Sequence, residues 1–557
     1  MPQLHADTVF VGGPVFTADA ARSFSDGVAV AGGRVLAVGD QAARELTGPR
    51  TEIVDLRGRL LLPGFVDAHA HPVFAGLELQ QCDLTGAEDA AQCLDRIVEY
   101  VAAHPEREWI VGGGWSMDHF ADGTPTRQQL DRICADRPVF LINRDRHGAW
   151  VNTEALRRAG VTATTPDPPR GRIEREPDGT PSGSLHEAAA DLVARHTPAP
   201  TAADHDRALE LGQCRMLELG VTSWQDALVG AYLHYPDTYD IYRRADAAGT
   251  LLARVVGAQW WDPTRGVDQV DELVERRAGA VAGRFRATSV KFMQDGVCEN
   301  FTAAMLAPYL GPPDGTSPGS GLSYLDPRDL AAGVGAVDHL GFQAHFHTIG
   351  DRAVREALDA VERARATRPA SVSGGHRGDN RHHLAHIQVI HPDDIPRFRA
   401  LRAAANMQPL WAHIDPQMSD LTAPFLGPER TERQYPFQQL RAAGATLVAG
   451  SDWPVSSPDP MLGIHVAVNR MAPGGSDGAP LTPHQRLTLV DALAAYTAGS
   501  SWINHLEHTL GSIAPGRDAD LVVLDRDPFL GSHDEISLVA VDETFVGGRR
   551  VHAREYA

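Results

Sequence analysis

Two histidines separated by a single residue are the first feature of this sequence that points to chemistry. His69 and His71 end the apolar segment 64–71, directly after Pro63. In a β-strand, residues i and i+2 project from the same face, so these two imidazoles converge on one point. Imidazole is the commonest protein ligand for Zn²⁺ and also binds other late divalent metals. Taken alone, the pair is as consistent with a chance spacing as with a metal site, because the chain has 25 histidines.

Four more polar residues lie in or at the ends of short apolar segments. Lys291 lies inside SVKFMQDG, His347 ends FQAHFH, His386 lies in HLAHIQ, and Asp452 ends TLVAGSD. A buried, unpaired ammonium is costly, so Lys291 must reach solvent, pair with Asp295, or lose its charge. Reaction with CO₂ would convert its amine into a carbamate able to bridge two cations. The combined set favours a metal centre over chance placement.

The elements that must position these residues follow a strand-then-helix rhythm. Such alternation predicts a parallel sheet with crossover helices, and eight repeats predict an α/β fold of the (β/α)8 TIM barrel type. The predicted strands are 64–71, 220–226, 252–258, 287–293, 342–347, 383–388, 403–409 and 446–452. The polar residues above then lie at the ends of strands one, four, five, six and eight, where active sites of this fold form.

Both ends of the chain read as short β-strands separated by glycine turns. We expect residues 1–62 and 505–557 to combine into a small β-sandwich domain, the alternative being a tail that packs on the barrel. Residues 63–504 would form the barrel, with an insertion of about 72–205 after its first strand.

Composition narrows the function classes. The formal net charge of −21, without a run of basic residues, argues against a nucleic-acid partner. The start lacks a secretory pattern, no stretch of 18 apolar residues suggests a membrane span, and five cysteines without a CxxC motif indicate reduced thiols. We therefore expect a cytoplasmic protein with a small-molecule substrate. A homodimer is left open.

Five segments together resemble a known family. PGFVDAHAHP, VKFMQDG, HFHTIGDRAV, HLAHIQ and GSDWPV resemble the amidohydrolase superfamily, and within it amidohydrolase family 3, the subgroup that includes N-substituted formamide deformylase. The likeness covers nearly the whole chain, including PGRDADLVVLDRDP near its end. It implies a metal-dependent hydrolase acting on carbon–nitrogen bonds other than peptide bonds.

The resemblance also implies roles for single residues. His69 and His71 would bind one divalent metal ion, and His347 and His386 the other, with zinc expected and manganese, iron or cobalt as alternatives. Lys291, carbamylated to a carboxylysine, would bridge the two. Asp452 would bind the first ion and shuttle the catalytic proton. His345 departs from the subgroup pattern; the HTIGDRAV context favours His347 over it as the ligand.

Four residues are candidates for contact with substrate. His147 and Glu187 lie in RDRHGAWVN and PSGSLHEAA, segments of the insertion that resemble elements of the subgroup. We expect them to contact substrate or cover the site; in the alternative, Glu187 lies in the first turn of a helix beginning near Ser184. Trp115 and Trp453 are expected to line the substrate-binding pocket. The alternative for both is ordinary packing.

Three functions compete. The first is hydrolysis of a small-molecule amide by metal-activated hydroxide. The second is another reaction on the same fold, by a mononuclear deaminase or a cyclic-amide or ester hydrolase. The third is an inactive barrel that serves as a binding protein. Lys291 is present and no HxE motif follows the fifth predicted strand, and together these features favour two metals over one. The presence of every expected ligand type argues against an inactive barrel.

Overall fold

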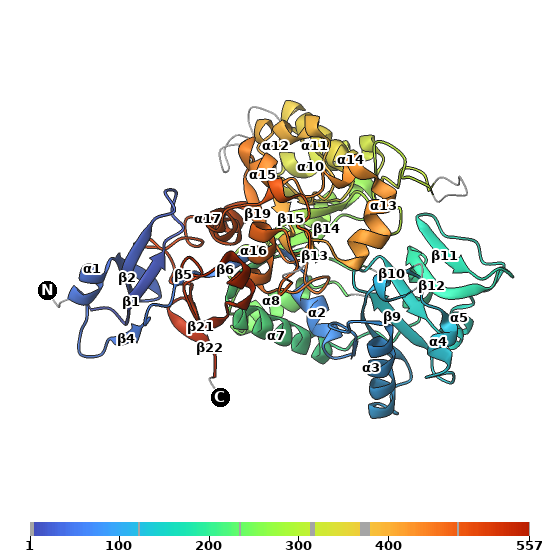
Figure 1. The fold of residues 1–557 in the computed structure, drawn as a ribbon, viewed down its shortest axis with the longest axis horizontal. Helices are drawn as coiled ribbons and strands as arrows, with labels where there is room; N and C mark the ends of the chain where they lie inside the picture. The colour runs from blue at the N-terminus through green and yellow to red at the C-terminus, as the bar shows by residue number, and fades with distance from the viewer. Residues whose placement is uncertain are drawn as a thin grey trace.

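A computed structural model of the protein describes residues 5–120, 123–232, 236–311, 318–367, 379–475 and 478–555. Three parts lie side by side in Figure 1. A sheet built from both chain ends lies at one end, a barrel lies in the middle, and a second sheet, built from residues between the first two barrel strands, lies at the other end.

The barrel is a sheet of eight parallel strands that follow one another in chain order. Between its last and first strands, the backbone N–H of Asp452 donates to the carbonyl of His69 at 2.7 Å. Each strand overlaps the segment predicted for it, so the predicted fold class is confirmed. The strands are β6 (Phe65–Ala70), β13 (Val221–Val229), β14 (Arg254–Trp260), β15 (Phe285–Met293), β16 (Gln343–Thr348), β17 (His383–His386), β18 (Ala404–Met407) and β19 (Leu447–Ala449).

Burial explains why these segments form barrel strands. Every residue of β6, β13 and β16 is buried, as expected for parallel strands covered by helices on one face and by the barrel interior on the other. In α11 (Asp351–Thr367), Val354, Ala357, Leu358 and Val361 are buried at helical spacing and form the face that packs on the barrel. Other covering helices are α7 (Ala202–Glu218), α8 (Tyr239–Ala248), α9 (Val270–Ala278), α10 (Pro327–His339), α12 (Ile395–Ala400) and α15 (Phe437–Ala442).

The two chain ends share one sheet of order β22-β21-β20-β5-β1-β2-β3, with β4 beside β1. Phe10 on β1 and Phe545 on β21 are three steps apart along this order, yet their ring centroids lie 5.1 Å apart. The sheet therefore folds back on itself as a sandwich around an apolar core. Its strands are β1 (Thr8–Phe16), β2 (Phe24–Ala31), β3 (Arg34–Val38), β4 (Glu52–Asp55), β5 (Leu61–Pro63), β20 (Leu521–Leu524), β21 (Val541–Val546) and β22 (Arg549–Ala553).

The inserted sheet has the order β11-β12-β10-β9-β8-β7. Glu187 is the last residue of β12, and Ser184 lies within the same strand. The alternative that Glu187 lies in the first turn of a helix beginning near Ser184 is therefore wrong. The turn from β9 to β10 carries residues 144–147. The strands are β7 (Cys82–Asp83), β8 (Ile110–Trp115), β9 (Val139–Asn143), β10 (Gly148–Val151), β11 (Gly171–Arg175) and β12 (Pro181–Glu187), with helices α3 (Ala90–Ala103), α4 (Arg127–Asp131) and α5 (Thr153–Ala159).

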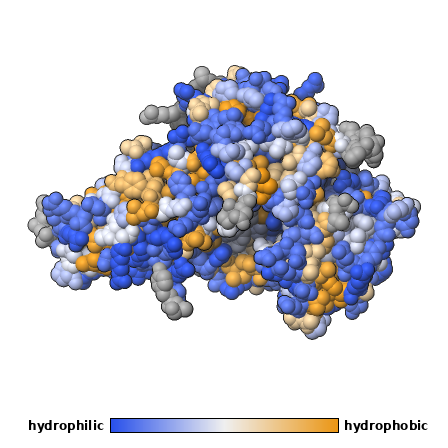
Figure 2. Space-filling model, viewed as in Figure 1, coloured by the Kyte–Doolittle hydropathy of each residue, from blue (hydrophilic) through white to orange (hydrophobic). Residues whose placement is uncertain are grey.

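The face of the molecule drawn in Figure 2 is mainly hydrophilic, with smaller apolar patches between the polar regions. Among the described residues, no helix is both long enough and apolar enough to cross a membrane.

Candidate metal centre

The carboxyl ends of the barrel strands bring together six side chains from five places in the sequence. All six are buried. One comes from β6 and one from the residue just after it, one each from β15, β16 and β17, and one from the segment that follows β19. They are the residues predicted as metal ligands: His69, His71, Lys291, His347, His386 and Asp452.

Asp452 lies between His69 and His71. Its Oδ1 atom is 3.2 Å from Nε2 of His69 and 3.1 Å from Nε2 of His71. One donor atom from each of these three residues lies within 4.8 Å of the others. Asp452 adopts a positive φ of 58°, a backbone conformation that a residue rarely adopts without a constraint. Its N–H bond to His69 supplies part of that constraint.

His347 and His386 extend this cluster. Their ring centroids are 4.4 Å apart, and the centroid of His386 is 4.8 Å from that of His69. Burial lowers the pKa of His69 to about 3 and holds the pKa values of His347 and His386 well below the usual histidine range. These imidazoles are therefore neutral near pH 7, the form in which their ring nitrogens can bind a metal.

Lys291 is buried in the same group. Burial lowers its pKa to about 8, while Asp452 and Asp226 act in the opposite direction. Asp295, considered above as its partner, is occupied elsewhere: its carboxylate accepts the N–H groups of Ile349 at 3.0 Å and Gly350 at 2.8 Å. A lysine whose pKa is this close to neutrality has an appreciable uncharged fraction, the form that reacts with CO₂.

Two positioning residues became visible only in the structure. Nε2 of His345 lies 2.9 Å from Nδ1 of His69, and Oδ1 of Asp295 lies 3.2 Å from Nδ1 of His347. Each contact occupies one ring nitrogen of a predicted ligand and so orients the other ring nitrogen. Metal-binding histidines usually have such a hydrogen-bond partner on the nitrogen that does not face the metal. His345 is thus placed behind His69. Its spacing from His347 was visible in the sequence, whereas nothing there linked Asp295 to a histidine.

The donor set fits divalent cations. Within the described part of the chain, Nδ1 of His71 and Nδ1 of His386 are buried without a hydrogen-bond partner. Neutral imidazoles and a carboxylate are the ligand types that zinc, manganese, iron and cobalt accept. The pKa of Asp452 is held well below its usual range, because its contacts with His69 and His71 outweigh burial, so this carboxylate is ionised.

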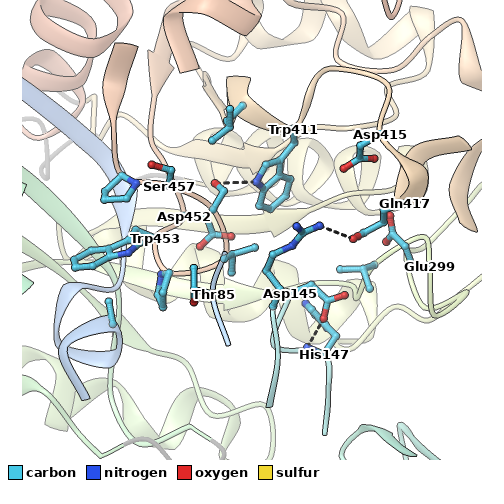
Figure 3. A pocket seen from close by; sticks show the side chains of 18 of the residues that line it. Thr85, Asp145, His147, Glu299, Trp411, Asp415, Gln417, Asp452, Trp453 and Ser457 are labelled. Carbon is cyan, nitrogen blue, oxygen red and sulfur yellow. Dashed lines mark hydrogen bonds between the residues drawn. The ribbon is translucent and has the colours of Figure 1, made fainter. Parts of the chain in front are cut away.

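A pocket of about 570 Å³ opens beside the cluster and is bordered by His347 and Asp452. The Trp411 ring lies parallel to the imidazole of His386, with centroids 5.0 Å apart and an angle of 4° between the planes. Its Nε1 atom donates to Oγ of Ser456 at 3.1 Å. Trp453 also lines the pocket, where it was predicted to wall the substrate. Figure 3 shows Trp411 and Asp452 facing the same space.

The insertion contributes a second wall of this pocket. In Figure 3, Asp145 and His147 approach from the turn between β9 and β10. The His147 ring lies 5.6 Å from that of His347, and its Nδ1 atom is 2.9 Å from Glu187. Burial disfavours a charge on His147, but the Glu187 carboxylate outweighs it and raises the pKa of His147 to about 9. A cationic imidazole therefore lies at the edge of the cluster of candidate ligands. Through its contact with His147, Glu187 is linked to this cluster.

The structure does not bring Trp115 to this pocket. Its ring packs in the core of the insertion against Trp150 and Phe120, with centroids 6.1 and 5.6 Å away. Its Nε1 atom donates to the carbonyl of Leu141 at 2.9 Å. Trp115 is not among the described residues that line the pocket, and ordinary packing accounts for its position.

The sequence is similar to known proteins over nearly its whole length. A model of the amidohydrolase family matches residues 52–552. Protein LONG AFTER FAR-RED 3 of Arabidopsis thaliana is 32% identical over 98% of this chain and 92% of its own length. N-substituted formamide deformylase of Arthrobacter pascens is 29% identical over 97% of each chain.

Among solved structures, an uncharacterized metal-dependent hydrolase from Pyrococcus horikoshii superposes with a TM-score of 0.72. It is 26% identical, and the match covers 94% of this chain and 99% of that one. The family match extends over most of the sequence, from the sandwich through the barrel. The chain therefore belongs to the amidohydrolase family.

Proposed function

We propose that the protein hydrolyses a non-peptide carbon–nitrogen bond, the amide of a small molecule, at a centre of two divalent cations. The observation that carries this proposal is the cluster itself. Four imidazoles, a lysine and an ionised carboxylate converge beside a pocket of about 570 Å³. The family match supports hydrolysis, and the relative named as a formamide deformylase supports an amide as the bond.

In this proposal His69 and His71 would hold one cation, and His347 and His386 the other. Lys291, as its carbamate, would bridge the two. When bound, such cations lower the pKa of a bound water toward neutrality and polarise a carbonyl oxygen. Zinc is the cation we expect, with manganese, iron and cobalt as alternatives that the same ligands accept.

The chain's own residues would move the proton. Asp452 borders both the cluster and the pocket, so its carboxylate can take a proton from the attacking water. It would then return that proton to the leaving nitrogen, which is otherwise a poor leaving group. His147, cationic and within the pocket wall, would donate a hydrogen bond to an oxygen of the substrate.

Metal analysis and a substrate panel test this proposal together. The protein would be stripped with a chelator, reloaded with zinc and assayed by mass spectrometry for metal content. We expect two ions per chain in the wild type, together with hydrolysis of at least some amides in a panel of N-acyl amines, formamides, cyclic amides and esters. One ion per chain with deaminase activity would favour the mononuclear alternative. No bound metal and no turnover would favour a binding protein.

The carbamate has a separate test. Protein equilibrated with ¹³C-labelled bicarbonate should show a carbamate carbon resonance, and Lys291→Met should remove it. Lys291→Arg is the matched control, because it keeps a cation of similar length that forms no stable carbamate. A resonance that persists in both variants would mean that another amine is carbamylated.

A further inference from the structure

The position of Asp452 decides which half of an amide faces the pocket of about 570 Å³, called here the outer pocket. Asp452 lines both this pocket and a cavity of about 50 Å³ among the candidate ligands. It is not among the described residues that line a further cavity of about 230 Å³ beside Tyr232 and Met293. A carboxylate that protonates the leaving nitrogen must lie on the nitrogen's side of the scissile bond. In the proposed reaction the amine half therefore faces the outer pocket.

The wall of the outer pocket has more acidic than basic side chains. Its described lining includes six carboxylates and two guanidinium groups, and the cationic ring of His147 is held by Glu187. Glu78 binds Arg146 at 2.7 Å, and Arg215 binds Glu218 at 3.2 Å, so these charges are balanced locally. Besides Asp452, the carboxylates that remain in this lining face a single guanidinium group, that of Arg144. They belong to Asp83, Asp145, Glu299 and Asp415.

Two of these carboxylates, Glu299 and Asp415, lie away from the candidate ligands. They line the outer pocket but not, among its described lining, the cavity between the ligands. In Figure 3 they lie on the opposite side of Asp452 from Trp453. Neither forms an ion pair with a described basic residue, because Arg144 donates instead to Oε1 of Gln417 at 2.9 Å.

Tyr435 independently indicates a ligand at the same place. The residue is only 2% exposed, yet its hydroxyl forms no hydrogen bond with any described residue. Buried tyrosine hydroxyls usually have a partner. Burial, followed by the negative charges of Glu299 and Asp415, holds the pKa of Tyr435 well above its usual value, so the hydroxyl is neutral. Because Tyr435 lines the outer pocket, a molecule in the pocket can supply the partner.

These three groups define the chemistry of the ligand. Burial raises the pKa of the Glu299 carboxyl, and hydrogen bonds with uncharged groups such as the Thr422 hydroxyl, at 2.6 Å, oppose this rise. A nearby cation would stabilise the charged form of both carboxylates. A protonated amine carries one positive charge and three N–H donors, enough for two carboxylates and one hydroxyl oxygen.

We propose that the substrate is an N-acyl amine whose amine half carries a second, protonated amine, and that Glu299, Asp415 and the Tyr435 hydroxyl bind this ammonium group. The inference rests on the proposed amide hydrolysis and names the substrate class for the same site. Apolar side chains of the same wall, among them Val297 and Trp411, suit the methylene groups that join the two nitrogen atoms.

The test compares acetamides that differ only at the far end of the amine half. N-acetyl-1,4-diaminobutane ends in an ammonium group, N-pentylacetamide in a methyl group, and N-acetyl-5-aminopentanoate in a carboxylate; released acetate is measured for all three. With zinc-loaded wild-type protein, kcat/KM should be at least about 10-fold higher for the ammonium end than for the methyl end, the scale of a hydrogen bond to a charged group. Asp415→Asn and Glu299→Gln should each remove most of this preference and leave the methyl amide within about twofold. Tyr435→Phe should lower the preference as well.

Asp83→Asn is the matched control. Asp83 lines the same pocket from β7 of the inserted sheet, and its Oδ1 atom accepts the N–H of Thr85 at 2.9 Å. Oδ1 of Asp415 accepts the N–H of Met418 in the same way, at 2.7 Å. Asp83→Asn removes the same charge and should leave the preference within about twofold. The inference is overturned if the wild type prefers the methyl or carboxylate end, or if Asp83→Asn lowers the preference as much as Asp415→Asn.

A binding measurement separates this inference from the proposed function. Calorimetric titration with 1,4-diaminobutane and 1-aminopentane measures the contribution of the second ammonium group without any turnover. If no amide is cleaved but the diamine binds at least about 10-fold more tightly, and Asp415→Asn removes that difference, the proposed amide hydrolysis fails while the ammonium site stands. If the two amines bind alike to the wild type, or if Asp415→Asn leaves their difference intact, these residues do not bind an ammonium group.

Discussion

Replacing Asp452 by asparagine separates proton transfer from metal binding. In the structure Oδ1 of Asp452 lies 3.2 Å from His69 and 3.1 Å from His71, so the side chain is close enough both to bind a cation and to exchange a proton. Four histidines and Lys291 remain as candidate ligands in the variant. Asparagine also tolerates the positive φ of 58° at this position better than most residues, so the local backbone should survive. The substitution should therefore act on chemistry more than on the fold.

We expect Asp452→Asn to keep most of its zinc and to lose about 10²- to 10⁴-fold in kcat, the usual contribution of a general acid–base group. This range corresponds to roughly 3 to 5 kcal/mol of transition-state stabilisation. An amide is close to the carboxylate in shape but cannot accept and return a proton. The assay measures kcat and KM on the best amide of the panel, with zinc per chain determined on the same sample.

His386→Ala is the comparison variant, because it removes a predicted ligand that does not carry the proton. It should lose metal and activity together while its circular dichroism spectrum stays that of the wild type. If Asp452→Asn loses metal as completely as His386→Ala, Asp452 acts mainly as a ligand. Unchanged kcat in Asp452→Asn would refute the reasoning, since another group would then move the proton.

Three further substitutions test other parts of the site. His345→Phe removes the ring nitrogen behind His69 and should weaken zinc binding by about 10- to 100-fold in a chelator competition, with His345→Gln partly restoring it; equal affinity in all three proteins would exclude a positioning role. Glu187→Gln removes the charge that stabilises cationic His147 and should raise KM with little change in zinc content, whereas a loss of zinc would make the pair part of the metal centre. Trp115→Phe removes the hydrogen bond to the Leu141 carbonyl and some buried ring area, and should lower the free energy of unfolding by about 1–2 kcal/mol in a denaturant titration with KM unchanged. A changed KM with unaltered stability would instead mean that Trp115 contacts the substrate.

Local patterns in the sequence were sufficient to predict the barrel and the six candidate ligands. All eight barrel strands lie where apolar segments alternate with helices, because burial on both faces leaves a continuous apolar signal. The candidate ligands were recognisable because each lies in or just beyond such a segment, and because parallel strands bring their carboxyl ends to one edge. A strand end is a local property, so its position along the chain is enough to predict it.

Tertiary structure decided what depends on contact between distant segments. His147 and His347 are 200 positions apart in the sequence, and only the packing of the insertion on the barrel brings their rings to 5.6 Å. Asp295 follows Lys291 closely enough to suggest an ion pair, yet the turn after β15 directs its carboxylate to His347. Trp115 lies inside the insertion because Trp150 and Phe120 cover it. A cavity of about 230 Å³ beside Tyr232 and Met293 is likewise bounded by side chains from separate strands and loops, and a void between such elements leaves no periodic signal in the sequence.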